Sequence, residues 1–93
     1  MATEVRNAED KSRYELLVDG KLAGVADYRI DGDRIVFPHT EIDPSRRGQG
    51  LGAVLVRRAL DDVRGSGRTV VPACWFVREF LDLNDDYADL RAA

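Results

Sequence analysis

The alternation of apolar and polar residues in the first half of the chain predicts an antiparallel meander. A first strand is expected over Arg13 to Val18, and the Asp19-Gly20 pair after it favours the positive dihedral angles of a two-residue hairpin turn. A second strand is expected from about Lys21 to Ile30. Another Asp-Gly pair, Asp31-Gly32, then leads into a third strand that begins at Arg34 and ends near Ile42. Three strands are therefore expected before any helix.

From Leu51 onward the period of the apolar residues changes to that of an amphipathic helix. Apolar side chains recur at intervals of three and four residues, at Leu51, Val54, Leu55, Ala59 and Val63. The glycines of Gly65-Ser66-Gly67 are expected to end this helix, and Thr69 to Val71 resembles a buried strand because it is short, β-branched and apolar. A strand, a helix and a strand in succession imply a right-handed crossover, so this last strand is expected to run parallel to the one that ends near Ile42.

The last third of the chain, Trp75 to Leu90, is predicted to be helical, with a candidate break at Asn84-Asp85-Asp86. An aromatic substrate platform of Trp75, Phe76 and Phe80 is one interpretation, but the helical spacing of Phe76, Phe80 and Leu83 favours core packing. The predicted order is β-β-β-α-β-α in an α/β fold with a mixed sheet. No repeat or linker divides residues 1–93, so a single domain is expected.

Composition and charge limit the classes of function. The 93 residues are 44% hydrophobic and 33% charged, as in ordinary globular proteins, and no apolar run approaches the roughly 20 residues of a membrane helix. The net charge of -3 argues against general nucleic-acid binding, since that affinity comes mainly from cations. The N-terminus does not resemble a secretory signal, so a cytoplasmic location is expected. The single cysteine, Cys74, gives no disulfide and no zinc-site spacing, so no metal is expected.

The segment between the third strand and the first helix carries the clearest binding signal. It contains Arg46, Arg47, Gly48, Gln49, Gly50, Leu51 and Gly52. A helix N-terminus leaves about four backbone N–H groups unpaired and carries the positive end of the helix dipole, so it attracts phosphate. Glycines let the backbone approach a bulky anion, and the two arginines add charge. The segment therefore predicts a phosphorylated ligand. The alternative is a tight connection with two solvated arginines.

The spacing of the glycines separates three phosphate-binding patterns. A Walker loop needs Gly-Lys followed by Ser or Thr, which is absent, and the dinucleotide pattern G-x-G-x-x-G differs from the G-x-G-x-G of Gly48, Gly50 and Gly52. The pattern Arg/Gln-x-x-Gly-x-Gly/Ala matches Arg47 to Gly52 at every fixed position. In this respect the chain resembles the GCN5-related N-acetyltransferases, and Ile42-Asp43-Pro44 before the turn is also similar to that superfamily.

The resemblance covers roughly Tyr14 to Leu90 and is to the short acetyltransferase-like proteins of about a hundred residues. It also includes Pro38 to Ile42, Val71 to Cys74 and Tyr87 to Leu90. It implies a truncated acetyltransferase fold that binds acetyl-CoA, with a backbone N–H of Ile42 or its neighbour facing the thioester oxygen and Tyr87 as a candidate acid for the departing thiolate. Two departures are Asn84-Asp85-Asp86-Tyr87 in place of His-Pro-Glu-Tyr, and Trp75 where a proline or small residue commonly follows the cysteine.

Acetyl transfer to an amine needs a base, and two candidates lie on the predicted third strand. His39 and Glu41 are two residues apart and so share a face, with Cβ atoms roughly 7 Å apart by strand geometry. Either could accept the proton, since histidine is a common general base near neutral pH and burial makes a carboxylate a stronger base. The structural alternative is a hydrogen-bonded histidine and a solvated or ion-paired glutamate. Cys74, before a predicted helix, is a candidate acetyl acceptor, a pocket-lining thiol or a small buried hydrophobe.

Two functions from different classes follow from these residues. The first is an acetyl-CoA-dependent N-acetyltransferase that acts on an unidentified small-molecule or peptide amine. The second is a noncatalytic acyl-CoA-binding or regulatory module, because so short a chain lacks the extra elements that enclose acceptors in larger relatives. Neither requires nucleic acid or a membrane. A monomer or weak homodimer is expected for a small domain with an exposed sheet edge.

Overall fold

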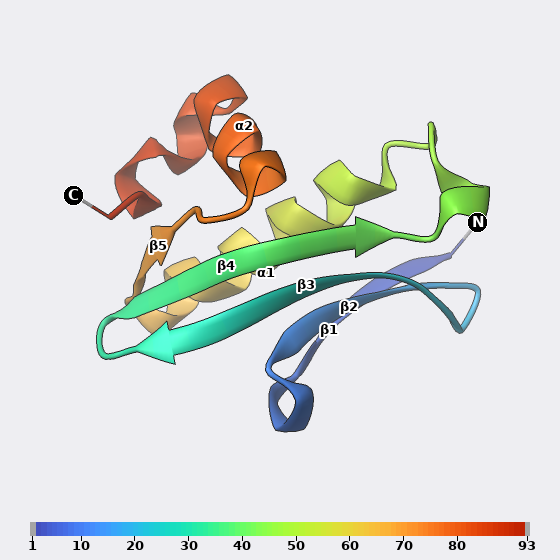
Figure 1. The fold of residues 1–93 in the computed structure, drawn as a ribbon, viewed down its shortest axis with the longest axis horizontal. Helices are drawn as coiled ribbons and strands as arrows, with labels where there is room; N and C mark the ends of the chain where they lie inside the picture. The colour runs from blue at the N-terminus through green and yellow to red at the C-terminus, as the bar shows by residue number, and fades with distance from the viewer. Residues whose placement is uncertain (1, 93) are drawn as a thin grey trace.

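The computed structural model describes residues 2–92, which form one curled five-stranded sheet with helices packed against it (Figure 1). The spatial order of the strands is their order in the sequence. The first four are antiparallel to their neighbours, and the fifth runs parallel to the fourth, as the predicted crossover requires. The strands are β1 (Thr3–Ala8), β2 (Arg13–Val18), β3 (Lys21–Asp31), β4 (Arg34–Ile42) and β5 (Thr69–Val71).

The prediction of only three strands before the first helix was wrong, because β1 also pairs with β2 at the edge of the sheet. Its sequence, Thr-Glu-Val-Arg-Asn-Ala, has one large apolar residue, Val5, which packs against the core. An edge strand tolerates such polarity because one of its sides and much of its surface remain in water. A single apolar residue gives no detectable alternation, so the strand is identified only by its partner.

Both predicted hairpins are present. Asp19 and Gly20 have φ values of 50° and 81°, as a two-residue turn of the primed type requires, and Val18 pairs with Lys21 across it. The second turn places Gly32 at φ 61° and pairs Asp31 with Arg34. These local signals set the meander of β2, β3 and β4 before any long-range contact is considered.

Helix α1 (Leu51–Ser66) crosses one face of the sheet, and α2 (Trp75–Leu83) lies beside it, near β4 and β5 (Figure 1). The buried stripe of α1 packs on the apolar face of the strands and consists of Leu51, Leu55, Val56, Ala59, Leu60 and Val63. Gly67 ends α1 in the left-handed region at φ 77°. None of the helices in residues 2–92 is long and apolar enough to cross a bilayer.

The C-terminal segment breaks at Asn84, as predicted, and continues as the 3-10 helix η3 (Asp85–Leu90). Core packing is confirmed for Phe80, which is 7% exposed, and is wrong for Leu83, which is 75% exposed. Leu83 is the last residue of α2, and its side chain lies beyond the part of the core that the helix covers. Trp75, at the other end of α2, is 68% exposed.

A buried carboxylate lies on the sheet face opposite α1. The side chain of Glu15 is 2% exposed and binds two arginines, with Arg13 Nη2 2.6 Å from Oε2 and Arg6 Nη2 2.9 Å from Oε1. The hydrogen bond from Arg13, and then that from Arg6, lower the pKa of Glu15 although burial opposes them. Arg6 itself is 57% exposed, so water screens this cluster more than it would a pair in the core.

The ion pairs of Glu15 predict that part of the free energy of unfolding is lost at acidic pH. Because the folded-state pKa of Glu15 lies below the unfolded value, its ionised form stabilises the fold above the unfolded pKa, and this contribution is lost as pH falls through the folded pKa. In urea unfolding series between neutral and acidic pH, Glu15→Gln is expected to flatten this loss. Asp82→Asn, which removes an exposed partner of Arg91, serves as the control and should keep the wild-type slope. Equal slopes for all three proteins would contradict the prediction.

Candidate functional site

The chain leaves β4 through a short turn that positions the glycine segment. Asp43 accepts hydrogen bonds from the backbone N–H and the hydroxyl of Ser45, at 3.0 and 2.9 Å, and the 3-10 helix η2 (Pro44–Arg46) follows. The first of these bonds lowers the pKa of Asp43 most, so the carboxylate remains ionised and keeps the turn closed. The turn therefore places Arg46 and Arg47 directly before α1.

Gly48 and Gly50 form an open approach to the N-terminus of α1. Their φ values are 83° and 73°, in the region that favours glycine, and no heavy atom lies within 4 Å of the position of an added Cβ at either residue. Gly50 is the N-cap residue, and no side chain caps the first N–H groups of the helix. Unpaired N–H groups, a helix dipole and free space are the features that a pyrophosphate requires.

The arginines before the turn remain available for an anion. Arg46 is half-buried and Arg47 is exposed, and within residues 2–92 neither side chain forms a salt bridge or a side-chain hydrogen bond. Other arginines of the domain are paired, such as Arg57 with Asp86 and Arg64 with Asp89. Two arginines without an acidic partner in the described part of the chain thus lie beside the turn where the sequence predicts that phosphates bind.

Gly52 has a different role from the other two glycines. A Cβ at this position would lie 2.7 Å from Cζ of Phe76, so the aromatic ring occupies the space beside the first turn of α1. The absence of a side chain at Gly52 thus lets the start of α2 approach the start of α1. The sequence motif predicts that Gly52 is a cofactor-binding residue, and the contact with Phe76 gives it in addition a packing role that the motif does not indicate.

Strands β4 and β5 separate just before the glycine turn. Their parallel register extends from Arg34 opposite Thr69 to Val36 opposite Val71, and one further bond joins the Cys74 N–H to the Phe37 carbonyl at 2.7 Å. Beyond Phe37, no backbone hydrogen bond joins β4 to this side in the part of the chain that the structure describes. The two segments therefore open a gap along the last residues of β4.

The direction of the β4 backbone leaves donors pointing into this gap. The N–H of Asp43 donates to the Ala23 carbonyl on β3, at 2.8 Å. Because successive N–H groups of a strand point in opposite directions, those of Ile42 and Thr40 point away from β3 and into the gap. The resemblance assigned the thioester oxygen to Ile42 or its neighbour, and the backbone of Ile42 has the orientation that this contact needs.

A β-bulge decides which face His39 and Glu41 occupy. Between Val36 and His39, β4 has one more residue than β3 has between Arg29 and Asp27, so Phe37 and Pro38 form the bulge. Ile42 then lies on the α1 face, where its Cδ1 is 2.5 Å from the Cβ position of Gly24, and the alternating residues His39 and Glu41 lie on the opposite face.

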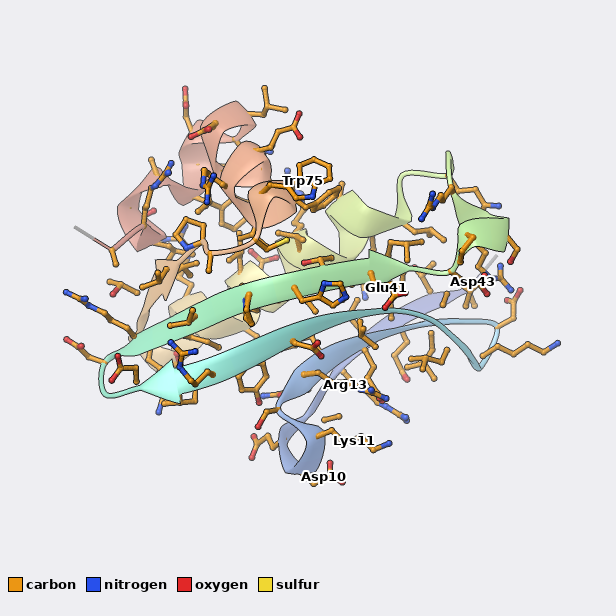
Figure 2. The ribbon with its side chains drawn as sticks, viewed as in Figure 1. Asp10, Lys11, Arg13, Glu41, Asp43 and Trp75 are labelled. Carbon is orange, nitrogen blue, oxygen red and sulfur yellow. The ribbon has the colours of Figure 1, made fainter. Side chains whose placement is uncertain are left out.

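His39 and Glu41 are neighbours, as predicted from their spacing. Nε2 of His39 is 3.4 Å from Oε2 of Glu41, and their side chains are 55% and 67% exposed. Glu41 also borders a shallow hollow of about 180 Å³ with Leu22, Val25 and Asp43 (Figure 2 labels Glu41 and Asp43). Both candidate bases are therefore accessible from the face of the sheet that α1 does not cover.

Cys74 lies at the inner end of the gap between β4 and β5. The residue is 7% exposed, and its Sγ is 3.7 Å from Oγ1 of Thr40. Burial raises the pKa of the thiol, but the N–H groups of Val77 and Phe76 at the start of α2, with the hydroxyl and N–H of Thr40, lower it below its ordinary value. The Cys74 side chain makes no capping hydrogen bond to α2, so these N–H groups affect the thiol only because they lie close to it. Cys74 therefore has an environment that favours the thiolate.

Comparison with known proteins agrees with this arrangement. The family sequence model described as GCN5-related N-acetyl-transferase matches residues 13–90. The chain belongs to the GCN5-related N-acetyltransferase family. Members of this family share a fold that uses acetyl-CoA.

Among curated relatives, a streptothricin acetyltransferase of Streptomyces lavendulae is 35% identical over 66 residues, which cover 69% of this chain and 35% of that protein. Protein NATD1 of Bos taurus is 31% identical over 86 residues, covering 86% of this chain and 74% of NATD1. This chain thus spans about a third of the first relative and most of the second. The solution structure of a GCN5-like protein from Staphylococcus aureus matches the fold with a TM-score of 0.74, at 22% identity, over 97% of this chain and 88% of that one.

Tyr87 lies apart from the cleft of this acetyltransferase fold. Its hydroxyl donates to Oδ1 of Asp61 at 2.6 Å and accepts from Arg57 at 3.2 Å. Asp61 is ten residues after Leu51, about 15 Å along the helix from the glycine turn at 1.5 Å per residue. Burial, and then the bond to Asp61, raise the pKa of Tyr87. These contacts make Tyr87 a clamp between η3 and α1, and they do not bring it to Cys74.

A larger hollow of about 690 Å³ lies at the C-terminal end of α1, away from the acetyltransferase cleft. Tyr14, Tyr28, Asp62 and Arg68 are among its lining residues. The Tyr14 hydroxyl is already bonded to Asp62, at 2.6 Å, and the Tyr28 hydroxyl to Asn7, at the same distance. The hollow contains neither the glycine turn nor the thiol, so its size does not make it the site of acetyl transfer.

Sequence reasoning assigned no specific role to two residues that lie beside the candidate site. Thr40, within the segment Pro38 to Ile42 of the resemblance, contacts the Cys74 thiol, and Phe76, expected to pack in the core, contacts Gly52. The parallel pairing predicted for Thr69 to Val71 was a signal that Cys74 would approach this part of β4. No local signal marks the approach of Phe76, because it depends on how closely α1 and α2 pack.

Proposed function

We propose that this chain is an acetyl-CoA-dependent N-acetyltransferase that acts on an amine approaching from the face of the sheet opposite α1. The observation that carries the proposal is that one short turn joins the end of β4, beside Cys74, to the uncapped N-terminus of α1. The uncapped N-terminus of α1 and the free Arg46 and Arg47 lie at one end, and the gap beside Thr40 and Cys74 lies at the other. A ligand with an anionic end and a thioester end fits such an arrangement.

The residues of the turn would hold the pyrophosphate. Backbone N–H groups of Gly48, Gln49, Gly50, Leu51 and Gly52 can donate to phosphate oxygens where the helix dipole also favours negative charge. Arg46 and Arg47 add charge-assisted hydrogen bonds, which are stronger than neutral ones. The conformations of Gly48 and Gly50 keep this surface open, so the backbone itself is the main binding element.

Acetyl-CoA supplies an activated acyl group whose carbonyl oxygen gains negative charge during attack by an amine. The Ile42 N–H, directed into the gap, is the donor that we assign to this oxygen. His39 and Glu41 are the candidate proton acceptors, and their mutual contact of 3.4 Å lets one orient the other. Both side chains are well exposed, so an amine bound on that face can reach them directly or through water.

Two roles for Cys74 follow from its position, and they predict different products. A thiol that lines the acyl pocket remains free, whereas a thiol that accepts the acetyl group becomes a thioester and releases the coenzyme A thiol. Intact mass after rapid quenching with acetyl-CoA separates the two roles. Cys74→Ser removes the nucleophilic sulfur with little change in volume and is the matched variant.

A noncatalytic acyl-CoA-binding module is the second candidate, and one observation favours it. The face that carries His39 and Glu41 is open to solvent, and no helix of residues 2–92 encloses an acceptor there. Such a module would use the same turn and the same gap. It differs from the enzyme only in that adding an amine would not release coenzyme A.

The test combines binding with turnover. Calorimetry with acetyl-CoA is expected to show binding by the wild type and a roughly tenfold or greater loss, about 1.4 kcal/mol, for Arg47→Ala. Arg29→Ala is the control, because Arg29 is an exposed residue of β3. This variant should bind acetyl-CoA as the wild type does. Release of the coenzyme A thiol that depends on an added amine supports the acetyltransferase. Binding of acetyl-CoA without such release supports the noncatalytic module. Absence of wild-type binding would refute both functions.

A further inference from the structure

The side chain of Trp75 is placed where a bound coenzyme A would cover it. It is the only tryptophan of the chain, yet it is 68% exposed. It begins α2 and contacts Phe76, with the two ring centroids 5.8 Å apart and the planes at 73°. An isolated exposed aromatic residue needs no explanation by itself, but the groups around Trp75 place it beside the proposed site.

The neighbours of Trp75 belong to both ends of the proposed cofactor site. On one side, Phe76 lies against Gly52 in the first turn of α1, at the phosphate end. On the other side, Cys74 contacts Thr40 at the acyl end. Figure 2 shows Trp75 at the start of α2. Trp75 thus lies between residues of the two ends, and a chain that joins those ends would pass along the start of α2.

We infer that Trp75 forms a wall for the pantetheine arm of coenzyme A, the flexible chain that joins the pyrophosphate to the sulfur. This inference rests on the proposed function. The arm alternates aliphatic carbons with amide groups, and an indole offers a broad apolar face with one N–H donor. The indole N–H has no hydrogen-bond partner among residues 2–92, so it is free to donate to an amide carbonyl of the arm.

The packing of Phe76 holds the indole in this place. Because Phe76 is wedged against Gly52, the first turn of α2 cannot rotate without moving the ring into α1. The adjacent Trp75 is thereby kept on the open side of the cleft. A preorganised aromatic surface contributes affinity with little loss of side-chain entropy on binding.

The single tryptophan allows a direct test by fluorescence and calorimetry. Coenzyme A and free pantetheine are expected to shift Trp75 emission, because the arm removes the indole from water. The nucleotide half, 3′-phospho-ADP, should bind at the turn without that shift. Trp75→Ala is expected to weaken coenzyme A binding about tenfold and to leave 3′-phospho-ADP affinity unchanged, whereas Trp75→Phe should retain most of the affinity. Leu83→Ala, at the exposed far end of α2, is the control.

The outcomes separate the inference from the proposed function. If the wild type does not bind coenzyme A, the proposed function fails and the inference fails with it. If the wild type binds but Trp75→Ala binds equally well, only the inference is overturned. Equal weakening of coenzyme A and 3′-phospho-ADP would also overturn it, because the indole would then contact the nucleotide instead of the arm.

Discussion

Replacing Gly50 by valine is expected to reduce the affinity for acetyl-CoA by at least tenfold, which corresponds to about 1.4 kcal/mol. The residue has φ 73°, where a β-branched side chain is strained, and the space around its Cβ position is free of protein atoms. The valine side chain would therefore occupy the volume that the phosphates need. The backbone would also tend to leave the conformation that exposes the first N–H groups of α1. Calorimetric titration measures the effect.

A matched control separates ligand exclusion from backbone strain. Gly32 lies in the hairpin between β3 and β4 with φ 61°, and its Cβ position is equally free of neighbours. Gly32→Val should thus lose a similar amount of stability, on the order of 1–2 kcal/mol, and keep the wild-type affinity for acetyl-CoA. Equal losses of affinity in the two variants would show that Gly50 matters only for folding.

Phe37→Ala is expected to lower the free energy of unfolding by about 3–5 kcal/mol, as truncation of a large buried aromatic residue usually does. Phe37 is 1% exposed, and its ring lies 6.2 Å from that of Tyr14 and 6.3 Å from that of Tyr28. Small domains are stable by only about 5–15 kcal/mol, so the loss is a large part of the total. Urea unfolding of the variant and the wild type measures it.

The exposed Leu83 provides the control for this prediction. Leu83→Ala also removes apolar atoms, but from a side chain that is 75% exposed, so a change within about 0.5 kcal/mol is expected. The effect of Phe37→Ala should also reach the site, because Phe37 forms the bulge and its carbonyl accepts the Cys74 N–H. A loss below 1 kcal/mol for Phe37→Ala would mean that the aromatic cluster contributes little to the core.

Much of the fold could be predicted because its signals are local. The Asp-Gly pairs specify tight turns through the conformational freedom of glycine, and the change from a two-residue to a 3.6-residue period marks the start of α1. The parallel pairing of β4 and β5 followed from the strand-helix-strand order, because the helix returns the chain to the end of the sheet where β4 starts. Strand β1 has no such signal, because an edge strand can be mostly polar.

The features of the candidate site also separate into those that local sequence determines and those that only packing determines. The amino-acid sequence by itself determined the glycine turn, its place before a helix and the neighbouring arginines, since each depends on residues within one short segment. Only the tertiary structure decided that the bulge at Phe37 and Pro38 turns His39 and Glu41 away from α1. It also decided that Tyr87 bonds to Asp61, that Gly52 accommodates Phe76 and that Trp75 remains exposed. These facts depend on how closely distant elements pack, and no local pattern of residues specifies that distance.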